Sequence, residues 1–217
     1  MDSSGAIIDL FGTINADNVA VYGKDDNDII TVARVSSGAQ TTVYAGGGND
    51  TINAGPVGGT LNEIRAELRV LGEDGIDTLN ANDTGDTNPN TGAMTFDTIS
   101  GILGSGGFVT YDSIATLNVG LGGNADTFTI ASTHTGATTV NGNNGDDTIN
   151  VRAISGPTTA NGGSGSDTFH VGNDTQGVDG IAISALNGDF LTETINRAID
   201  AGIPVVTWDS DAPKSRR

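Results

Sequence analysis

The chain has 217 residues, of which 33 are glycine and 5% are aromatic, and its formal net charge is -18. This composition excludes a thick globular core, and the acidity argues against a nucleic-acid partner because phosphate neutralisation needs Lys and Arg. The absence of Cys excludes disulfides, thiolate metal sites and thiol catalysis, and no apolar run is long enough to predict a membrane span.

A short motif recurs along the chain: a Gly- or Asn-rich turn, a closing Asp and a run of four β-prone residues. Strands are therefore expected at 29–32, 51–54, 78–81, 127–130, 148–151 and 168–171. The closing residues step by 22, 27, 49, 21 and 20 positions along the series Asp28, Asp50, Asp77, Asp126, Asp147 and Asp167. Repetition at such a period is typical of stacked, solenoid-like architectures.

A second short strand precedes the Gly-rich turn in several of these periods, at 40–43, 117–119, 137–140 and 157–160. Two strands and two turns in about 20 residues would make one coil of a parallel β-solenoid. Because side chains alternate across a strand, the inner face should take Phe128, Ile130, Ile149, Val151, Phe169 and Val171. The fold class predicted is therefore mainly β, a parallel and β-roll-like solenoid.

Two segments interrupt this pattern. Residues 82–92 are rich in Asn, Asp, Thr, Gly and Pro and are expected to form a loop excursion. In the segment 61–70, Leu61, Ile64 and Leu68 have helical spacing, yet its end leads directly into a Gly-rich turn. We expect a helical or irregular cap there that continues into a strand.

The closing aspartates give the repeat its candidate chemistry. In a parallel stack, each Asp would lie about 5 Å from its counterpart in the next coil. Such a pair of like charges costs on the order of 3 kcal/mol at an effective dielectric of about 20. A divalent cation between the turns would cancel this repulsion, and carboxylate with turn carbonyls suits Ca²⁺. The alternative is plain turn chemistry, with Asx hydrogen bonds and no metal.

Residues 162–169, Gly-Gly-Ser-Gly-Ser-Asp-Thr-Phe, fit the pattern GGxGxDxUx and resemble the nonapeptide of RTX calcium-binding β-rolls. The resemblance implies Ca²⁺ held between neighbouring turns by the Asp carboxylate and backbone carbonyls. Carried over position by position, the metal ligands would be Asp126, Asp147, Asp167, Asp50, Asp28 and Asp77. RTX arrays carry the motif on both sides of the roll. Here it occupies one turn per coil, so at most one row of ions is expected.

A longer stretch, 61–173, looks like a repeat of very large secreted bacterial proteins. It contains Asp77-Thr78-Leu79-Asn80, Asp83-Thr84-Gly85-Asp86, Gly106-Gly107-Phe108-Val109-Thr110-Tyr111 and Thr133-His134-Thr135-Gly136. The resemblance implies an extracellular or cell-surface location, although the first residues show no signal peptide. Partners would be calcium and cell-surface or matrix components, as in an adhesin-like protein.

Catalytic motifs are few. The two histidines are His134 and His170, and the second is expected on the outer face of a strand. There is no nucleophile elbow, zinc-protease motif or Walker loop. Glycan-degrading β-helix enzymes share only the general shape, and aromatic residues are too few here to predict a sugar cleft. We therefore expect a protein that is not an enzyme.

The composition changes at Val178, where Gly-rich turns stop. A strand at 181–184, an apolar helical pattern from Leu191 to Ile199 and a strand at 205–208 predict a βαβ unit. The segment 178–217 resembles part of the sugar-binding periplasmic proteins of ABC importers, which implies sugar contacts by Asp209 and Trp208. The remaining parts of that fold are absent, so sugar binding is expected only from a complete domain. Equally, the segment could cap the solenoid.

The sequence thus predicts two parts: a calcium-stabilised β-solenoid over 1–177 and an αβ segment over 178–217. The predicted function is structural, in a secreted or surface repeat protein whose folding is coupled to Ca²⁺. A truncated sugar-binding fragment fused to a solenoid is the alternative.

Overall fold

The computed structural model describes residues 7–10, 18–172, 181–184, 200 and 205–208, in two compact units, 1–170 and 171–217. Its strands are short, and most hold four or five residues. They are β1 (Ile7–Leu10), β2 (Asn18–Lys24), β3 (Ile29–Val32), β4 (Gln40–Gly48), β5 (Thr51–Ala54), β6 (Glu67–Gly75), β7 (Thr78–Asn82), β8 (Thr91–Met94), β9 (Thr98–Ser100), β10 (Phe108–Asp112), β11 (Thr116–Gly120), β12 (Thr127–Ile130), β13 (Ala137–Asn144), β14 (Thr148–Val151), β15 (Thr158–Ser164), β16 (Thr168–Val171), β17 (Ile181–Ser184) and β18 (Val205–Trp208).

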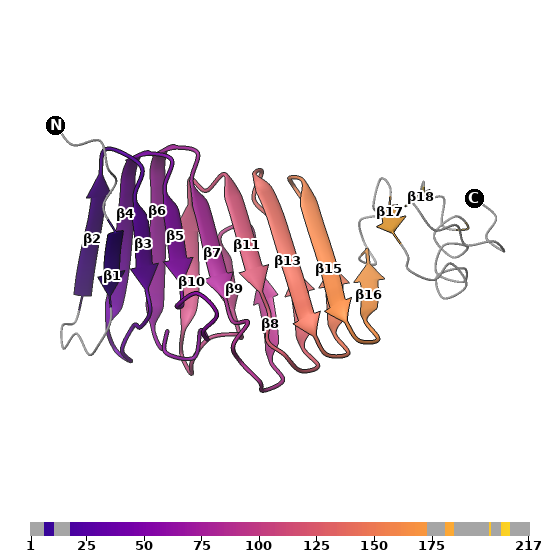
Figure 1. Cartoon of the computed structure of the whole chain (residues 1–217). Coiled ribbons are helices and arrows are strands. Elements are labelled where there is room, and N and C mark those ends of the chain that lie inside the picture. Colours follow the sequence, from indigo (N-terminus) through magenta and orange to yellow (C-terminus); the bar gives the residue numbers. More distant parts are fainter. Residues whose placement is uncertain (1–6, 11–17, 173–180, 185–199, 201–204, 209–217) are drawn as a thin grey trace. The chain divides into compact units, whose positions relative to one another are not determined.

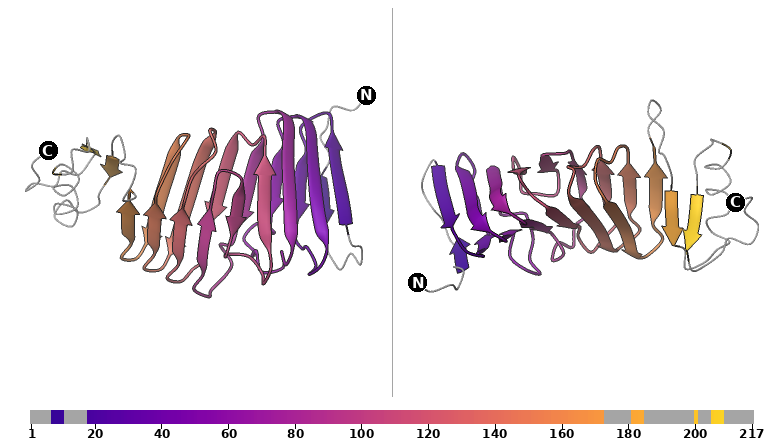
Figure 2. Two further views of the ribbon diagram at one scale, coloured as in Figure 1. Left: turned by 180° about the vertical axis from the view of Figure 1, so that it is seen from behind. Right: turned by 90° about the horizontal axis from the view of Figure 1, so that it is seen from above.

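The first unit consists of two facing sheets between which the chain alternates (Figures 1 and 2). The seven-stranded sheet has the order β1-β3-β5-β7-β11-β13-β15, and the nine-stranded sheet has the order β16-β14-β12-β8-β9-β10-β6-β4-β2. The strand pairs are parallel apart from the two that β9 makes with β8 and β10. The protein is therefore mainly β with parallel sheets, in a solenoid-like arrangement.

The register follows the sequence repeat. Phe128 pairs with Ile149 and Ile130 with Val151, as the alternation of side chains predicts. One continuous core fills the space between the sheets, and Phe128, Ile130 and Ile149 are fully buried in it. Phe169 and Val171 share this register position but remain 38% and 41% exposed. Their strand, β16, ends its sheet, so no further coil covers them among the described residues.

Amide ladders line the outer face of the seven-stranded sheet. The Nδ2 of Asn80 donates to the Oδ1 of Asn53 over 3.0 Å, and the Nδ2 of Asn118 donates to the Oδ1 of Asn80 over 2.9 Å. His170 is exposed, as expected, and its Nδ1 lies 3.0 Å from the Oδ1 of Asn150. These outward-facing polar contacts connect successive coils at the surface, outside the hydrophobic core.

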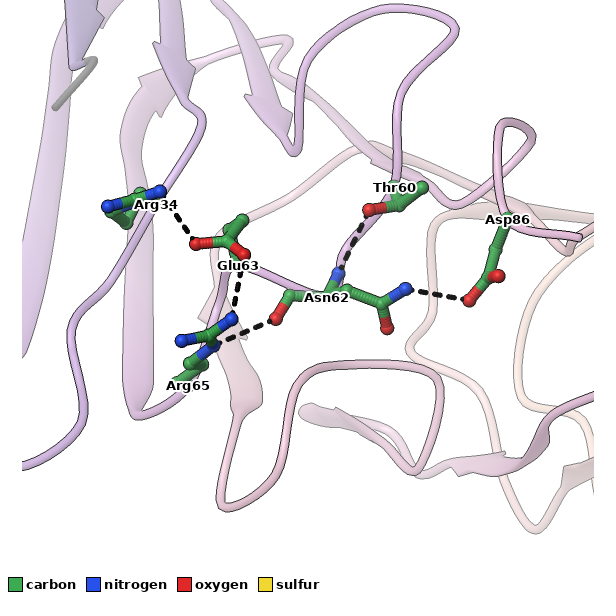
Figure 3. A network of polar contacts seen from close by, with 6 residues as sticks. All are labelled: Arg34, Thr60, Asn62, Glu63, Arg65 and Asp86. Carbon is green, nitrogen blue, oxygen red and sulfur yellow. Dashed lines mark hydrogen bonds and ion pairs between the residues drawn. The ribbon is translucent and has the colours of Figure 1, made fainter. Parts of the chain in front are cut away.

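The expected cap at 61–70 contains no helix. Leu61, Ile64 and Leu68 are fully buried, but Leu61 lies in a bend and Ile64 forms an isolated parallel bridge with Val35, both before β6 begins at Glu67. The helix-like spacing of these three residues therefore arises without a helix, because each contacts the core separately. Figure 3 shows how this segment is held: Glu63 pairs with Arg34 over 2.8 Å and with Arg65 over 2.7 Å.

The described part of the second unit is a parallel pair, β17 and β18, in the register Ile181 to Val205. Both strands have the bounds that the sequence predicts. The helical pattern between Leu191 and Ile199, the change at Val178 and the sugar-contact candidate Asp209 lie outside the described residues. In the described part of the chain, no helix has the length and apolarity needed to cross a membrane.

Candidate carboxylate ladders

The closing aspartates form two rows at opposite edges of the first unit, which corrects the expectation of a single row. Asp28, Asp50 and Asp77 close turns that lead from the nine-stranded into the seven-stranded sheet. The turns at Asp126, Asp147 and Asp167 lead from the seven-stranded into the nine-stranded sheet. Since the chain winds in one direction, these two kinds of turn occur at different edges, as the connections in Figure 1 show. We call the rows the first and the second ladder.

The change of edge occurs within the segment between Asp77 and Asp126. Between Asp77 and Asp126 the chain forms the antiparallel strand β9 and passes three times through the nine-stranded sheet, as β8, β9 and β10. When the motif resumes at Asp126, its turn follows β11 of the seven-stranded sheet and precedes β12 of the nine-stranded sheet. The earlier motif turns precede strands of the seven-stranded sheet. The 49-residue gap in the repeat contains this change of side, which spacing alone does not reveal.

In the first ladder, the carboxylates of Asp50 and Asp77 each bind the backbone of the coil before them. The Oδ1 of Asp50 accepts the N–H of Asp28 over 2.7 Å, and the Oδ1 of Asp77 accepts the N–H of Asp50 over 2.8 Å. The three residues are at most 3% exposed. The carboxylates therefore connect successive coils as well as closing their own turns.

The second ladder repeats this contact. The Oδ1 of Asp147 accepts the N–H of Asp126 over 2.8 Å, and the Oδ1 of Asp167 accepts the N–H of Asp147 over 3.0 Å. Asp126 is bound from the insertion, by the N–H of Asn90 over 2.6 Å. Asp126 and Asp147 are buried, whereas Asp167 at the last turn is half-buried.

The second oxygen of three of these buried carboxylates has no hydrogen-bond partner among the described residues. These oxygens are the Oδ2 atoms of Asp50, Asp77 and Asp147. A buried carboxylate oxygen without a donor disfavours the charged form, so the group binds a proton or a cation. Burial accordingly raises the pKa of all three carboxyl groups, against the lowering effect of the backbone hydrogen bond that each accepts.

A glycine at the start of the turn gives each of two such oxygens a neighbouring carbonyl. A Cβ on Gly142 would lie 2.3 Å from both the Oδ2 of Asp147 and the carbonyl oxygen of Gly162 in the next coil. A Cβ on Gly72 would lie 2.7 Å from the Oδ2 of Asp77 and 2.0 Å from the carbonyl oxygen of Ser113. Carboxylate and carbonyl oxygens thus converge beneath the turn, and hard oxygen pairs of this kind fit Ca²⁺.

Other ladder positions fit a cation less well. The Oδ2 of Asp126 accepts the N–H of Gly122 over 2.9 Å, so this oxygen is already satisfied. The position that is glycine before Asp77 and Asp147 is Ala45 before Asp50. No three His, Cys, Asp or Glu side chains of the described residues form a metal cluster, so backbone carbonyls would have to supply the other ligands. The residues fit a calcium site at Asp77 and Asp147 best.

Asp83 and Asp86 are two buried carboxylates that lie outside the repeated Gly-rich motif. Asp83 accepts the N–H of Leu61 over 2.7 Å, and burial raises its pKa to about 7, with further upward effects from the charges of Asp86 and Asp126. For Asp86, burial is outweighed by hydrogen bonds, including one of 2.8 Å from Asn62 (Figure 3), so its pKa is lowered. The sequence signal that could have identified both residues is the Asp-Thr dipeptide, which occurs at Asp83-Thr84 and at Asp86-Thr87.

The remaining candidates lie elsewhere. Trp208 ends β18, and its suggested partner Asp209 lies outside the described residues, so the sugar contacts are not tested. His134 is half-buried against Tyr111, with ring centroids 5.8 Å apart at an interplanar angle of 84°. Neither histidine lies in a carboxylate ladder.

Comparison with known proteins links only the C-terminal part of the chain to a family. The family model described as a periplasmic binding protein domain matches residues 174–217. This match spans far less than half of the chain. No curated protein and no solved structure matches the chain.

Proposed function

We propose that the first unit is a calcium-binding structural segment, a β-roll-like solenoid that belongs to a secreted or cell-surface protein and has no enzymatic role. The observation that carries the proposal is the unpartnered Oδ2 of the buried Asp77 and Asp147, each next to a carbonyl oxygen of the following coil. The ion would neutralise stacked carboxylates that are desolvated and close to one another.

Burial makes this neutralisation necessary. A carboxylate that is removed from water must find hydrogen-bond donors, a counterion or a proton. In each ladder the Oδ1 atoms have backbone donors. The charge at each unpartnered Oδ2 atom can be neutralised in two ways. A proton does this at low pH, where the raised pKa values favour it, and a cation can do it at neutral pH.

Two ladders at opposite edges would place ions on both sides of the stack. Calcium is plentiful outside cells, so the segment would be ordered there and loose where the ion is scarce, in accordance with coupled metal binding and folding. A row of repeated coils without a catalytic cluster also suits a spacer or adhesin-like role towards cell-surface or matrix components.

Calorimetric titration of the full chain with Ca²⁺ at neutral pH tests the proposal, with Mg²⁺ as the comparison ion. We expect saturable calcium binding at more than one site and weak binding of Mg²⁺, because a site built from carbonyls and carboxylates lacks the rigid octahedral geometry that Mg²⁺ requires. Absence of saturable calcium binding would leave plain turn chemistry as the explanation of the motif.

A second candidate function concerns the second unit. The periplasmic binding protein match at 174–217 supports a fragment that derives from a sugar-binding protein, with Asp209 as the contact residue. Calorimetry with ribose, xylose and glucose tests it. Saturable binding that Asp209→Ala abolishes would support this function, and no binding of any of the three would reject it.

A further inference from the structure

A groove of about 790 Å³ lies next to the connection 113–115, the first turn on the edge of the first ladder that lacks the Gly-rich motif. Its walls come from β6, β10 and the turn between β8 and β9, and its remaining lining comes from the connections around Ser113 and Thr135. The preceding Gly-rich turn, with the exposed Ile76, gives way here to the short connection 113–115. The change in turn length leaves this hollow beside the first ladder.

Phe96 is the most unusual residue of the groove, because its side chain is 61% exposed although its backbone is firmly held. The N–H of Phe96 donates to the Oγ of Ser132 over 3.0 Å. On one side of it, the carbonyl of Thr95 accepts the Tyr111 hydroxyl over 2.7 Å, and on the other, the N–H of Tyr111 donates to the carbonyl of Asp97 over 2.9 Å. An aromatic ring on a fixed turn loses little conformational entropy when a ligand covers it.

The polar lining of the groove consists of fixed hydrogen-bonding groups. Glu67 accepts the Thr110 hydroxyl over 3.0 Å and also binds Gln40. Asp97 accepts the hydroxyl of Thr95 over 2.8 Å and that of Thr98 over 3.0 Å. These contacts orient each carboxylate while leaving other lone pairs for a ligand. Hydroxyls of Thr133, Thr135 and Ser155 complete the lining.

The charge of the groove restricts its ligand. Its lining contains the carboxylates of Glu67, Asp97 and Asp112 and one guanidinium, that of Arg69. In a chain of net charge -18 this excess of carboxylates repels phosphates and acidic polymers. The charge therefore favours a neutral or a positively charged ligand. The exposed ring of Phe96 beside fixed carboxylate and hydroxyl groups suits a neutral ligand with an apolar face and several hydroxyl donors.

We propose that this groove binds a neutral oligosaccharide, with the apolar C–H face of a sugar ring against Phe96 and sugar hydroxyls donating to Glu67, Asp97 or Asp112. The proposal is independent of calcium binding and of the second unit. It departs from the expectation that aromatic residues are too few to form a sugar cleft, because it needs only one exposed ring in the groove.

Calorimetry of the full chain in calcium-containing buffer tests the proposal with cellohexaose, mannohexaose and xylohexaose as neutral probes and hexagalacturonate as the anionic one. We expect at least one neutral probe to bind saturably and the anionic probe not to bind. Phe96→Ala should weaken the binding about tenfold or more, since it removes the apolar contact. Phe96→Tyr, which keeps the ring face, should retain the binding.

Phe169→Ala is the matched control, because Phe169 is an exposed phenylalanine on β16 outside the groove, and it should leave the affinity unchanged. Asp209→Ala should also leave it unchanged, which separates this groove from any site in the second unit. Failure of all three neutral probes to bind, equal binding by wild type and Phe96→Ala, or Phe96-dependent binding of hexalysine in place of a sugar would overturn the proposal.

Discussion

At the scale of single residues, one atom distinguishes the proposed calcium ligand Asp147 from a neighbouring Asp in the same turn. The Oδ1 atom of Asp147 accepts the N–H of Asp126, whereas its Oδ2 atom is buried without a hydrogen-bond partner in the described part of the chain. The neighbouring Asp146 is exposed, and its Oδ1 accepts the N–H of Ser166 over 2.8 Å. The two residues have the same charge in adjacent positions but opposite environments.

Asp147→Asn should therefore reduce the stabilisation by calcium and leave the calcium-free protein at least as stable as wild type. The amide keeps an oxygen for the Asp126 N–H while it removes a buried charge. We expect the calcium-induced gain in the free energy of unfolding to fall by about 1–3 kcal/mol. Urea unfolding with Ca²⁺ and with EDTA measures this gain. Asp146→Asn is the control, and an equal loss in both variants would show that Asp147 has no special role.

The pH dependence of the calcium-free protein provides a second prediction at this scale. The pKa of Asp83 rises on folding from 3.8 to about 7, mainly through burial. A group whose pKa is raised on folding contributes stability that is fully present below pH 3.8 and is lost as the pH rises through about 7. The raised pKa values of Asp50, Asp77 and Asp147 act in the same direction.

In EDTA, the free energy of unfolding should accordingly decrease between about pH 4 and pH 7. Urea unfolding at a series of pH values measures the slope. Asp83→Asn should make the slope shallower, whatever its effect on absolute stability, because the titrating group is gone. A stability that increases over this range in EDTA would contradict the burial of uncompensated carboxylates.

At the scale of elements, the sequence predicts the strands well because their signals are local. Alternating apolar residues after a closing Asp identified β3, β5, β7, β12, β14 and β16 within a residue of their ends. The inner positions at Phe128 and Ile149 are equally local. The segment 61–66 and the buried Asp83 could not be assigned in this way, because their contacts come from coils more than 20 residues away.

The Gly-rich turns have a requirement that goes beyond backbone conformation. At Gly142, a Cβ would lie 2.3 Å from the carbonyl oxygen of Gly162 and 2.3 Å from the Oδ2 of the buried Asp147, whose Oδ1 holds the N–H of Asp126. At Gly47, in the turn of an earlier coil, the nearest such atom is the Oδ1 of Asp25 at 3.6 Å. Glycine is therefore needed for close approach at the first position but not at the second.

Gly142→Ala should destabilise the protein by about 1–3 kcal/mol, as overpacking in a rigid environment does, and it should weaken calcium binding at Asp147. Gly47→Ala should change the stability little. Thermal and urea unfolding of the two variants in Ca²⁺ measure the difference. Similar losses in both would indicate that the turns need glycine only for its backbone freedom.

At the scale of the first unit, the two ladders are separated by the segment between Asp77 and Asp126. The repeat predicts that coils stack, but the sheet to which a strand belongs depends on how many times the chain crosses between sheets. Between β7 and β11 the chain crosses twice, as in an ordinary coil, because β8, β9 and β10 all belong to the nine-stranded sheet. The motif is missing from the two turns of this coil, 83–90 and 113–115, and returns at Asp126 on the opposite edge. The same segment forms the hairpin of β8 and β9 that carries Phe96, so the part of the chain that separates the ladders also supplies a wall of the groove.

The coupling of calcium to folding is tested most directly by far-ultraviolet circular dichroism of the full chain at neutral pH, first in EDTA and then during titration with Ca²⁺. If ions neutralise the two ladders, the β signal should be weak in EDTA, increase on addition of calcium and saturate, and the melting temperature should rise with it. An identical β spectrum and an identical melting temperature in EDTA and in calcium would contradict this account.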